Sequence, residues 1–131
     1  MSDRVHFLGF RDDVKQLYKT ADIFCLPSYR EGLSASVMEA MAASLPVVCS
    51  DIRGNKDLIV QDKGGYLISI EDTHCYADSL NAIIQSERLR VEMGTFNMNY
   101  VKLFSLKKVV QDMEAIYMDI INMDMKGGNH G

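Results

Sequence analysis

The sequence predicts an α/β domain built on an open parallel sheet, and three observations predict it. Short apolar runs alternate with longer segments whose apolar residues recur at helical spacing. The run at residues 21–26 is continuous rather than alternating in its apolarity, which is typical of a strand that is covered on both faces. Strands separated by helices are also the signature of right-handed βαβ units.

The first half of the chain supplies the predicted strands. Residues 4–9 form a first short strand that a glycine closes, and a helix follows from Asp12. Residues 21–26 form a second strand, which stops at Pro27-Ser28. A helix over about 34–43 then leads to a third strand.

The third strand is predicted over residues 46–49 and ends at a polar Ser50-Asp51 pair. A short helix over 56–60 follows, and a glycine turn leads to the last strand over 66–69. The result is a Rossmann-like sheet of about four strands with flanking helices. Four strands are few for a complete domain of that type, so we expect part of one.

The C-terminal third is predicted to be helical from residue 71 onward. A second helix is expected to begin at 89–93 and a third to span 105 to about 123, and Met113 on the third is expected to be core. One face of that helix is apolar, formed by Val109, Met113, Ile116, Tyr117 and Ile120. The domain is expected over residues 1–125, with a disordered tail at 126–131.

Composition limits the class of protein. Apolar residues make up 47% of the 131 residues and charged residues 24%, as in a soluble globular domain. The 14 basic and 18 acidic residues leave a net charge of −4, which argues against nucleic-acid binding. The chain shows neither an apolar signal region nor a membrane span, so a cytoplasmic location is expected.

The cysteines do not form a disulfide framework or a metal site. Three cysteines are an odd number, they stand far apart, and no histidine stands at metal spacing from them. Cys25 and Cys49 each end an apolar run, where a free thiol behaves as a small buried hydrophobe. No metal is therefore predicted.

Common catalytic and nucleotide-binding motifs are missing from the sequence. It contains no GxxxxGK[ST] phosphate loop, no GxGxxG after a strand and no GxSxG nucleophile elbow. The segment that remains, residues 26–50, follows the carboxyl end of a strand, where ligands of open α/β sheets bind. Gly32 lets the backbone approach a ligand closely. Leu33, Ser34 and Ala35 then present free N–H groups at a helix N-terminus, a suitable site for a pyrophosphate.

Two glutamates flank that helix start. Glu31 precedes the helix, and Glu39 lies about 7–8 Å along its axis. The separation approaches the wide carboxylate spacing of inverting glycosidases. It suits two ends of one elongated ligand better, because each carboxylate can accept two hydrogen bonds from a vicinal diol.

The motif PS-x-x-EG-L-x-x-x-x-x-EA-M-A, which spans both glutamates, resembles the donor-site signature of retaining glycosyltransferases of the GT-B fold, family 4. The resemblance covers about residues 4–120. Other matching segments stand in the family's order: Val5-x-Phe-Leu-Gly9, Ala21-Asp-Ile-Phe-x-Leu-Pro-Ser28, Pro46-Val-Val48, Gly54 and Gly65-Tyr-Leu-Ile68.

The resemblance implies part of a C-terminal, donor-binding domain that takes a nucleotide-diphosphate sugar. Glu31 would contact the donor sugar near the reacting carbon, the amides of residues 32–35 would hold the diphosphate, and Glu39 would hold the ribose. Arg11 would lie beside the base. No metal and no cofactor would be needed, because the helix dipole and basic side chains stabilise the leaving diphosphate.

The sequence departs from the family pattern at several positions. Ser44 and Ser34 stand where glycine is common, and Asp57 stands where glutamate is usual. Glycine at the position of Ser44 relieves a left-handed helix end, so Ser44 is expected to adopt that conformation at a cost of about 1 kcal/mol. The family's diphosphate-clamping Arg and Lys and its N-terminal acceptor domain are not found in these residues. We therefore expect part of a metal-independent hexosyltransferase of polysaccharide or glycoconjugate biosynthesis, with no turnover by the 131 residues alone.

Two alternatives remain from the sequence. One is a non-catalytic nucleotide-sugar-binding or regulatory half-domain, and the other is a purely structural α/β domain. The expected partners are the donor and the acceptor domain, with membrane association only through the parent protein. The apolar face of the last helix also leaves self-association open.

Overall fold

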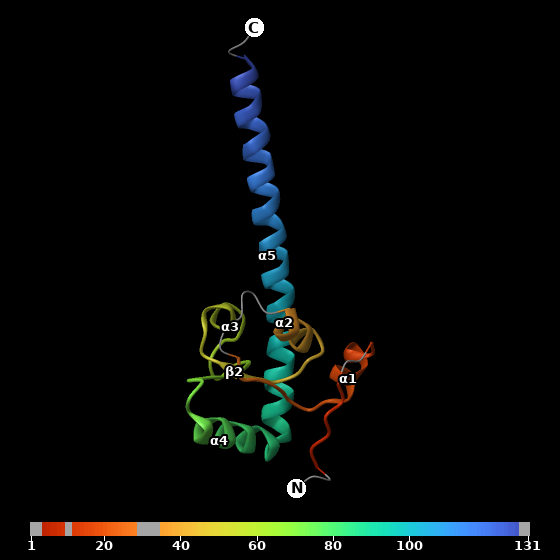
Figure 1. Ribbon diagram of the computed structural model, residues 1–131. Coiled ribbons are helices and arrows are strands. Elements are labelled where there is room, and N and C mark those ends of the chain that lie inside the picture. Colours follow the sequence, from red (N-terminus) through yellow and green to blue (C-terminus); the bar gives the residue numbers. More distant parts are fainter. Residues whose placement is uncertain (1–3, 10–11, 29–34, 129–131) are drawn as a thin grey trace.

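Three parallel strands and five helices make up the described part of the computed structural model, residues 4–9, 12–28 and 35–128 (Figure 1). In chain order the elements are α1 (Val14–Thr20), β1 (Phe24–Leu26), α2 (Ala35–Ala42), β2 (Val47–Ser50), α3 (Arg53–Leu58), β3 (Gly65–Ile68), α4 (Thr73–Ile84) and α5 (Glu87–Gly128).

The sheet has the order β1-β2-β3 and both pairings are parallel. Phe24 pairs with Val47, and Val47 pairs in turn with Gly65. A Cβ on Gly65 would overlap the Val47 backbone, so this close approach requires glycine. The open, parallel, Rossmann-like α/β sheet that the sequence predicts is confirmed.

Helices cover both faces of the central strand. On one face, Val47 and Cys49 join a core with residues of α2 and α3. On the other face, Val48 packs with residues of α4 and with Met93 of α5. Every residue of β2 is buried, which explains why its apolar run is continuous rather than alternating.

The prediction of a strand at residues 4–9 is wrong, and the described sheet has three strands instead of about four. No described strand pairs with these residues, and Phe7 is 97% exposed. An apolar run becomes a strand only where a neighbouring strand accepts its hydrogen bonds and a layer covers its side chains. Neither condition is met here.

The predicted burial of the cysteine thiols is confirmed for Cys49 and is wrong for Cys25. Cys49 on β2 is fully buried, and burial raises the pKa of its thiol to about 12. Cys25 is exposed, contrary to expectation. It lies on the edge strand β1, whereas α4 packs mainly against β2 and β3.

The C-terminal helix α5 is one uninterrupted helix, not the separate helices predicted at 89–93 and 105–123. It packs so closely on the end of α2 that a Cβ on Gly94 would overlap the carbonyl of Ser44. It extends through Gly128, so it includes the first residues of the segment 126–131 expected as a tail. At 42 residues it is about 63 Å long.

Ser44 ends α2 in the left-handed conformation, as expected where relatives carry glycine. Its φ is 63°, and it donates its N–H to Met41 while Leu45 donates to Ala40. These two bonds form a Schellman motif, in which the left-handed residue is normally glycine. Ser44 therefore carries a local conformational strain.

We predict that Ser44→Gly stabilises the chain by about 1 kcal/mol, because glycine has no Cβ to strain at positive φ. Ser44→Ala is the control, since it removes only the weak hydroxyl contact to the Met98 sulfur. Urea denaturation followed by circular dichroism measures both variants. Equal stabilities of Ser44→Gly and the wild type would contradict the prediction.

Asn97 joins α5 to the loops that precede two strands. Its fully buried Nδ2 donates to the Leu45 carbonyl at 2.8 Å and to the Gly64 carbonyl at 2.7 Å. Leu45 precedes β2 and Gly64 precedes β3. One amide therefore holds the amino ends of both strands against the helix.

We predict that Asn97→Asp destabilises the fold by about 3 kcal/mol, because a carboxylate cannot donate to two carbonyls and is buried facing them. Asn99→Asp is the matched control, since Asn99 is exposed on the same helix. Thermal unfolding at neutral pH measures the difference. Similar losses in both variants would show that the Asn97 bridge contributes little.

Candidate functional site

The candidate site lies at the carboxyl edge of the sheet, where β1 ends at Leu26 and α2 begins at Ala35. Ala35 is exposed at the first position of α2. The remaining positions of the predicted donor signature, Glu31, Gly32, Leu33, Ser34 and Arg11, lie outside the described residues. Their predicted roles stay predictions.

Ser50 organises the end of the two strands. Its side chain is fully buried, and its Oγ accepts hydrogen bonds from the Ser28 N–H and from the Tyr76 hydroxyl, the latter at 3.2 Å. The same hydroxyl lies 3.4 Å from the Leu26 carbonyl, to which it donates. One serine therefore ties the end of β2 to α4 and to the start of the loop that leads toward Glu31.

Asn55 of α3 also contacts the carboxyl end of β2. Its buried Nδ2 donates to the Ser50 carbonyl at 2.9 Å. Its Oδ1 is buried and makes no hydrogen bond to a described residue. The sequence predicts Ser50 only as the end of a strand and does not single out Asn55. The signal in the sequence is the polar Ser50-Asp51 pair at the end of a buried strand, where polar side chains can fix the backbone at the edge of a site.

Glu39 lies exposed on α2, where the sequence predicts the second carboxylate. The Tyr18 hydroxyl of α1 lies near it and near Ser36. Burial raises the pKa of Tyr18, and the charge of Glu39 adds to the effect. Tyr18 is thus a neutral hydroxyl near pH 7 and can donate to the carboxylate beside it.

The Tyr18 contact was not predicted, because the helical spacing marked that residue only as part of an apolar stripe. Its ring does pack, edge to face, on Phe24 at a centroid distance of 5.7 Å. A tyrosine can bury its ring and still present a polar tip. No sequence pattern separates these two uses.

A groove of about 460 Å³ begins beside Glu39 and runs between α2 and α5. Its lining is mostly aliphatic, with the Glu39 carboxylate and the Lys102 ammonium as its charged groups; it is formed by Met38, Glu39, Ala42, Val101, Lys102 and Ser105. Glu39 therefore lies near Tyr18 and also lines this groove.

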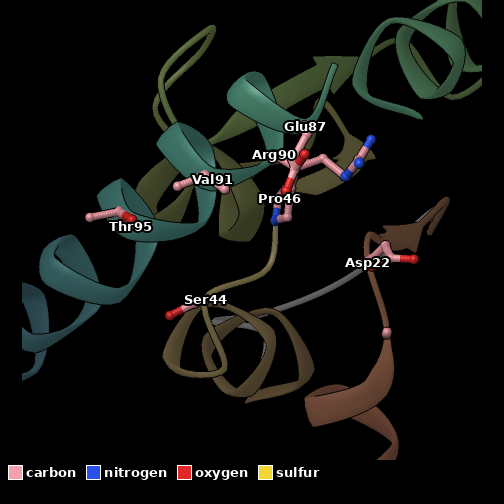
Figure 2. A pocket seen from close by; sticks show the side chains of 8 residues that line it. Asp22, Ser44, Pro46, Glu87, Arg90, Val91 and Thr95 are labelled. Atoms are coloured by element: carbon pink, nitrogen blue, oxygen red, sulfur yellow. The ribbon is translucent and has the colours of Figure 1, made fainter. Parts of the chain in front are cut away.

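A second cavity, of about 360 Å³, lies at the opposite edge of the sheet (Figure 2). It is lined by Ala21, Asp22, Ser44, Pro46, Glu87, Arg90, Val91 and Thr95. These residues precede β1 and β2 or begin α5, whereas ligands of open α/β sheets bind at the carboxyl ends. Arg90 is also engaged, because its Nη1 donates to the carbonyls of Ile83 and Ile84. We do not assign the donor to this cavity.

Neither metal clusters nor membrane spans are found in the described part of the chain. Residues 4–9, 12–28 and 35–128 contain no group of three or more His, Cys, Asp or Glu side chains arranged to hold a metal ion. No helix among them combines the length and apolarity needed to cross a bilayer.

Curated relatives share most of this chain but extend well beyond it. It is 33% identical over 125 residues to the putative glycosyltransferase EpsD of Bacillus subtilis, covering 95% of this chain and 33% of that protein. It is 32% identical over 128 residues to N-acetyl-alpha-D-glucosaminyl L-malate synthase of Bacillus anthracis, covering 97% and 34%. The chain thus spans about a third of the length of these relatives.

Solved structures show the same fold. Sucrose-phosphate synthase of Thermosynechococcus elongatus superposes with a TM-score of 0.80 at 25% identity, over 91% of this chain and 31% of that one. The C-terminal domain of a glycosyl transferase group 1 family protein of Francisella tularensis gives 0.67 at 25% identity, over 76% and 51%. TarM of S. aureus gives 0.77 at 25% identity, over 86% and 23%.

The sequence model of the family "Glycosyl transferases group 1" matches residues 1–99, which include the whole sheet and the segment between the two predicted glutamates. The expected fold, part of a GT-B glycosyltransferase, agrees with the structural neighbours. This chain belongs to the glycosyl transferases group 1 family.

Proposed function

We propose that this chain forms the donor-binding part of a retaining glycosyltransferase that uses a nucleotide-diphosphate sugar. The observation that carries the proposal is the position of Glu39, which stands at its place in the family's donor signature, is exposed on α2 and lies near the Tyr18 hydroxyl of α1. The parent protein would transfer the sugar to an acceptor held by a further domain.

The start of α2 suits the diphosphate. The first N–H groups of a helix have no partner within the helix, and the helix dipole adds partial positive charge there. Ala35 opens α2 directly after the loop from β1, and no acidic residue of its first turn opposes an anion. With the amides of residues 32–34 this would form the phosphate site, and the charge would be stabilised without a metal ion.

Glu39 suits the ribose. It lies four residues into α2, about 6 Å along the axis from Ala35, which is close to the extent of a diphosphate. An ionised carboxylate offers about four lone-pair positions. Glu39 can therefore keep the Tyr18 hydroxyl and still accept both hydrogens of a vicinal diol. Glu31 would take the sugar and Arg11 would lie by the base.

The names of two related proteins suggest uridine as the first base to test. The galactosyltransferase of Escherichia coli that is 28% identical to this chain is named for UDP-Gal. The TarM structure is a complex with UDP. Retention of configuration is proposed from the resemblance of the motif to retaining enzymes. Because the chain spans a third of its relatives, we expect binding without turnover by the 131 residues alone.

We predict that UDP binds with a Kd near 1 mM and that Glu39→Ala weakens binding about tenfold, since losing hydrogen bonds to a carboxylate costs about 1.4 kcal/mol or more. Isothermal titration with UDP, GDP and ADP measures this. Glu92→Ala is the control, because Glu92 is an exposed glutamate that pairs only with Arg88 at the surface. No binding of any nucleotide, or equal binding by the wild type and Glu39→Ala, would contradict the donor site. Sugar transfer by the isolated chain would contradict the expected lack of turnover.

We also predict that Tyr18→Phe weakens UDP binding about two- to threefold, because Glu39 keeps its charge but loses the hydroxyl that orients it. The folded structure should persist, since the ring still packs on Phe24. Tyr117→Phe serves as the control, as Tyr117 is exposed far along α5. An effect as large as that of Glu39→Ala would instead place Tyr18 in direct contact with the nucleotide.

A further inference from the structure

Helices α2 and α3 both begin at the carboxyl edge of the sheet. α2 follows β1 and α3 follows β2, and these two strands are parallel neighbours. Both helices lie on one face of the sheet, whereas α4 lies on the other (Figure 1). Leu58 of α3 packs in the same core cluster as Val37 and Met41 of α2. The first turn of α3 therefore lies beside the first turn of α2, since packed helix axes are about 8–10 Å apart.

Buried hydrogen bonds fix the start of α3 relative to the end of β1. In the first turn of α3, Asn55 Nδ2 donates to the Ser50 carbonyl at 2.9 Å. The Oγ of the same Ser50 accepts from the Ser28 N–H and donates to the Leu26 carbonyl at 3.4 Å. Ser50 and Asn55 are fully buried. The first turn of α3 cannot move away from the β1 end without leaving these polar groups unpaired, which is costly in a buried network.

Arg53 is the basic residue that this arrangement brings to the carboxyl edge. It is the first residue of α3 and is exposed, whereas the next two residues, Gly54 and Asn55, are buried. The Cα–Cβ bonds of a helix are tilted toward its N-terminus. The side chain of Arg53 therefore leaves α3 in the direction of the edge at which ligands of open α/β sheets bind.

The positive charge of Arg53 is not neutralised by a neighbour. Within the part of the chain that the structure describes, its guanidinium makes neither a hydrogen bond nor an ion pair, not even with Asp57 four residues further along α3. Lys56, the other cation of α3, is paired, because its Nζ lies 3.5 Å from Asp51 Oδ1. That pair also neutralises the carboxylate that follows β2. The first turns of α2 and α3 contain no acidic residue, so nothing in them opposes an anion.

We propose that Arg53 binds the diphosphate of the donor from the side of α3. The proposal rests on the proposed function and adds to that site a cation, which the family's Arg and Lys clamp does not supply in these 131 residues. A guanidinium presents N–H donors in a fixed fork and can bind two phosphate oxygens at once. The start of α2 would contact one side of the diphosphate, and Arg53 would contact the other.

Titration of the full chain with UDP, UMP and uridine, followed by NMR, tests the proposal. For Arg53→Gln we expect the Kd of UDP to rise about fivefold, since an exposed charge-assisted contact is lost. The Kd of UMP should rise less and that of uridine should not change, because only the phosphates meet the guanidinium. Arg53→Lys should recover part of the affinity for UDP, since it keeps the charge but not the fork.

Lys63→Gln is the matched control. Lys63 is also exposed, but it precedes β3 and so lies at the opposite edge of the sheet. Removing its charge should leave all three Kd values unchanged. Both substituted side chains are exposed, so circular dichroism should show the same fold for each variant. A loss of UDP affinity in Lys63→Gln equal to that in Arg53→Gln would overturn the proposal, because it would assign the effect to net charge alone.

The titration separates failure of this proposal from failure of the donor site. Equal UDP affinity of the wild type and Arg53→Gln would overturn the role of Arg53 and leave the donor site standing. Equal losses for UDP and uridine would also overturn it, because the substitution would then act away from the phosphates. If the wild type bound no UDP, the proposed function would be contradicted, and the role of Arg53 with it.

Discussion

Complete burial of β2 is the constraint on which the rest of this structure depends. A strand covered on both faces needs helices on each side, and α2 and α4 supply them. Its amino end is held by the Asn97 amide of α5, and its carboxyl end by the Ser50 hydroxyl. Because both ends are tied by buried polar side chains, the sheet cannot shift in register without leaving those groups unpaired.

The candidate site follows from that arrangement. Ser50 bonds to the backbone on either side of the β1 end, so the loop toward α2 leaves the sheet from a fixed point. The Schellman motif at Ser44 fixes the other end of α2. With that end held and its buried residues packed in the core, α2 keeps Glu39 at one position relative to the sheet edge, near Tyr18. A donor would meet a carboxylate on a rigid element.

The sequence predicted the features that depend on local chemistry and missed those that depend on neighbours. Continuous apolarity predicted β2, and the glycine usual at Ser44 predicted a left-handed residue there. Residues 4–9 also form a short run that ends at a glycine, but no described strand pairs with them, so the predicted strand does not form. Exposure of Cys25 depends on which strands α4 covers, and the approach of Tyr18 to Glu39 depends on how α1 and α2 meet. Neither leaves a periodic signal in the sequence.

Helix α5 has two parts with different surroundings. Up to Val101 it directs its apolar residues into the core, and the 3.6-residue period of a straight helix suits that role. From Leu103 onward most of its apolar residues are exposed, including Met113, which the sequence predicts to be core and which is 64% exposed. The groove beside Glu39 lies between α2 and α5. Both helices pack against the same core, so the groove keeps its shape for a ligand that reaches Glu39.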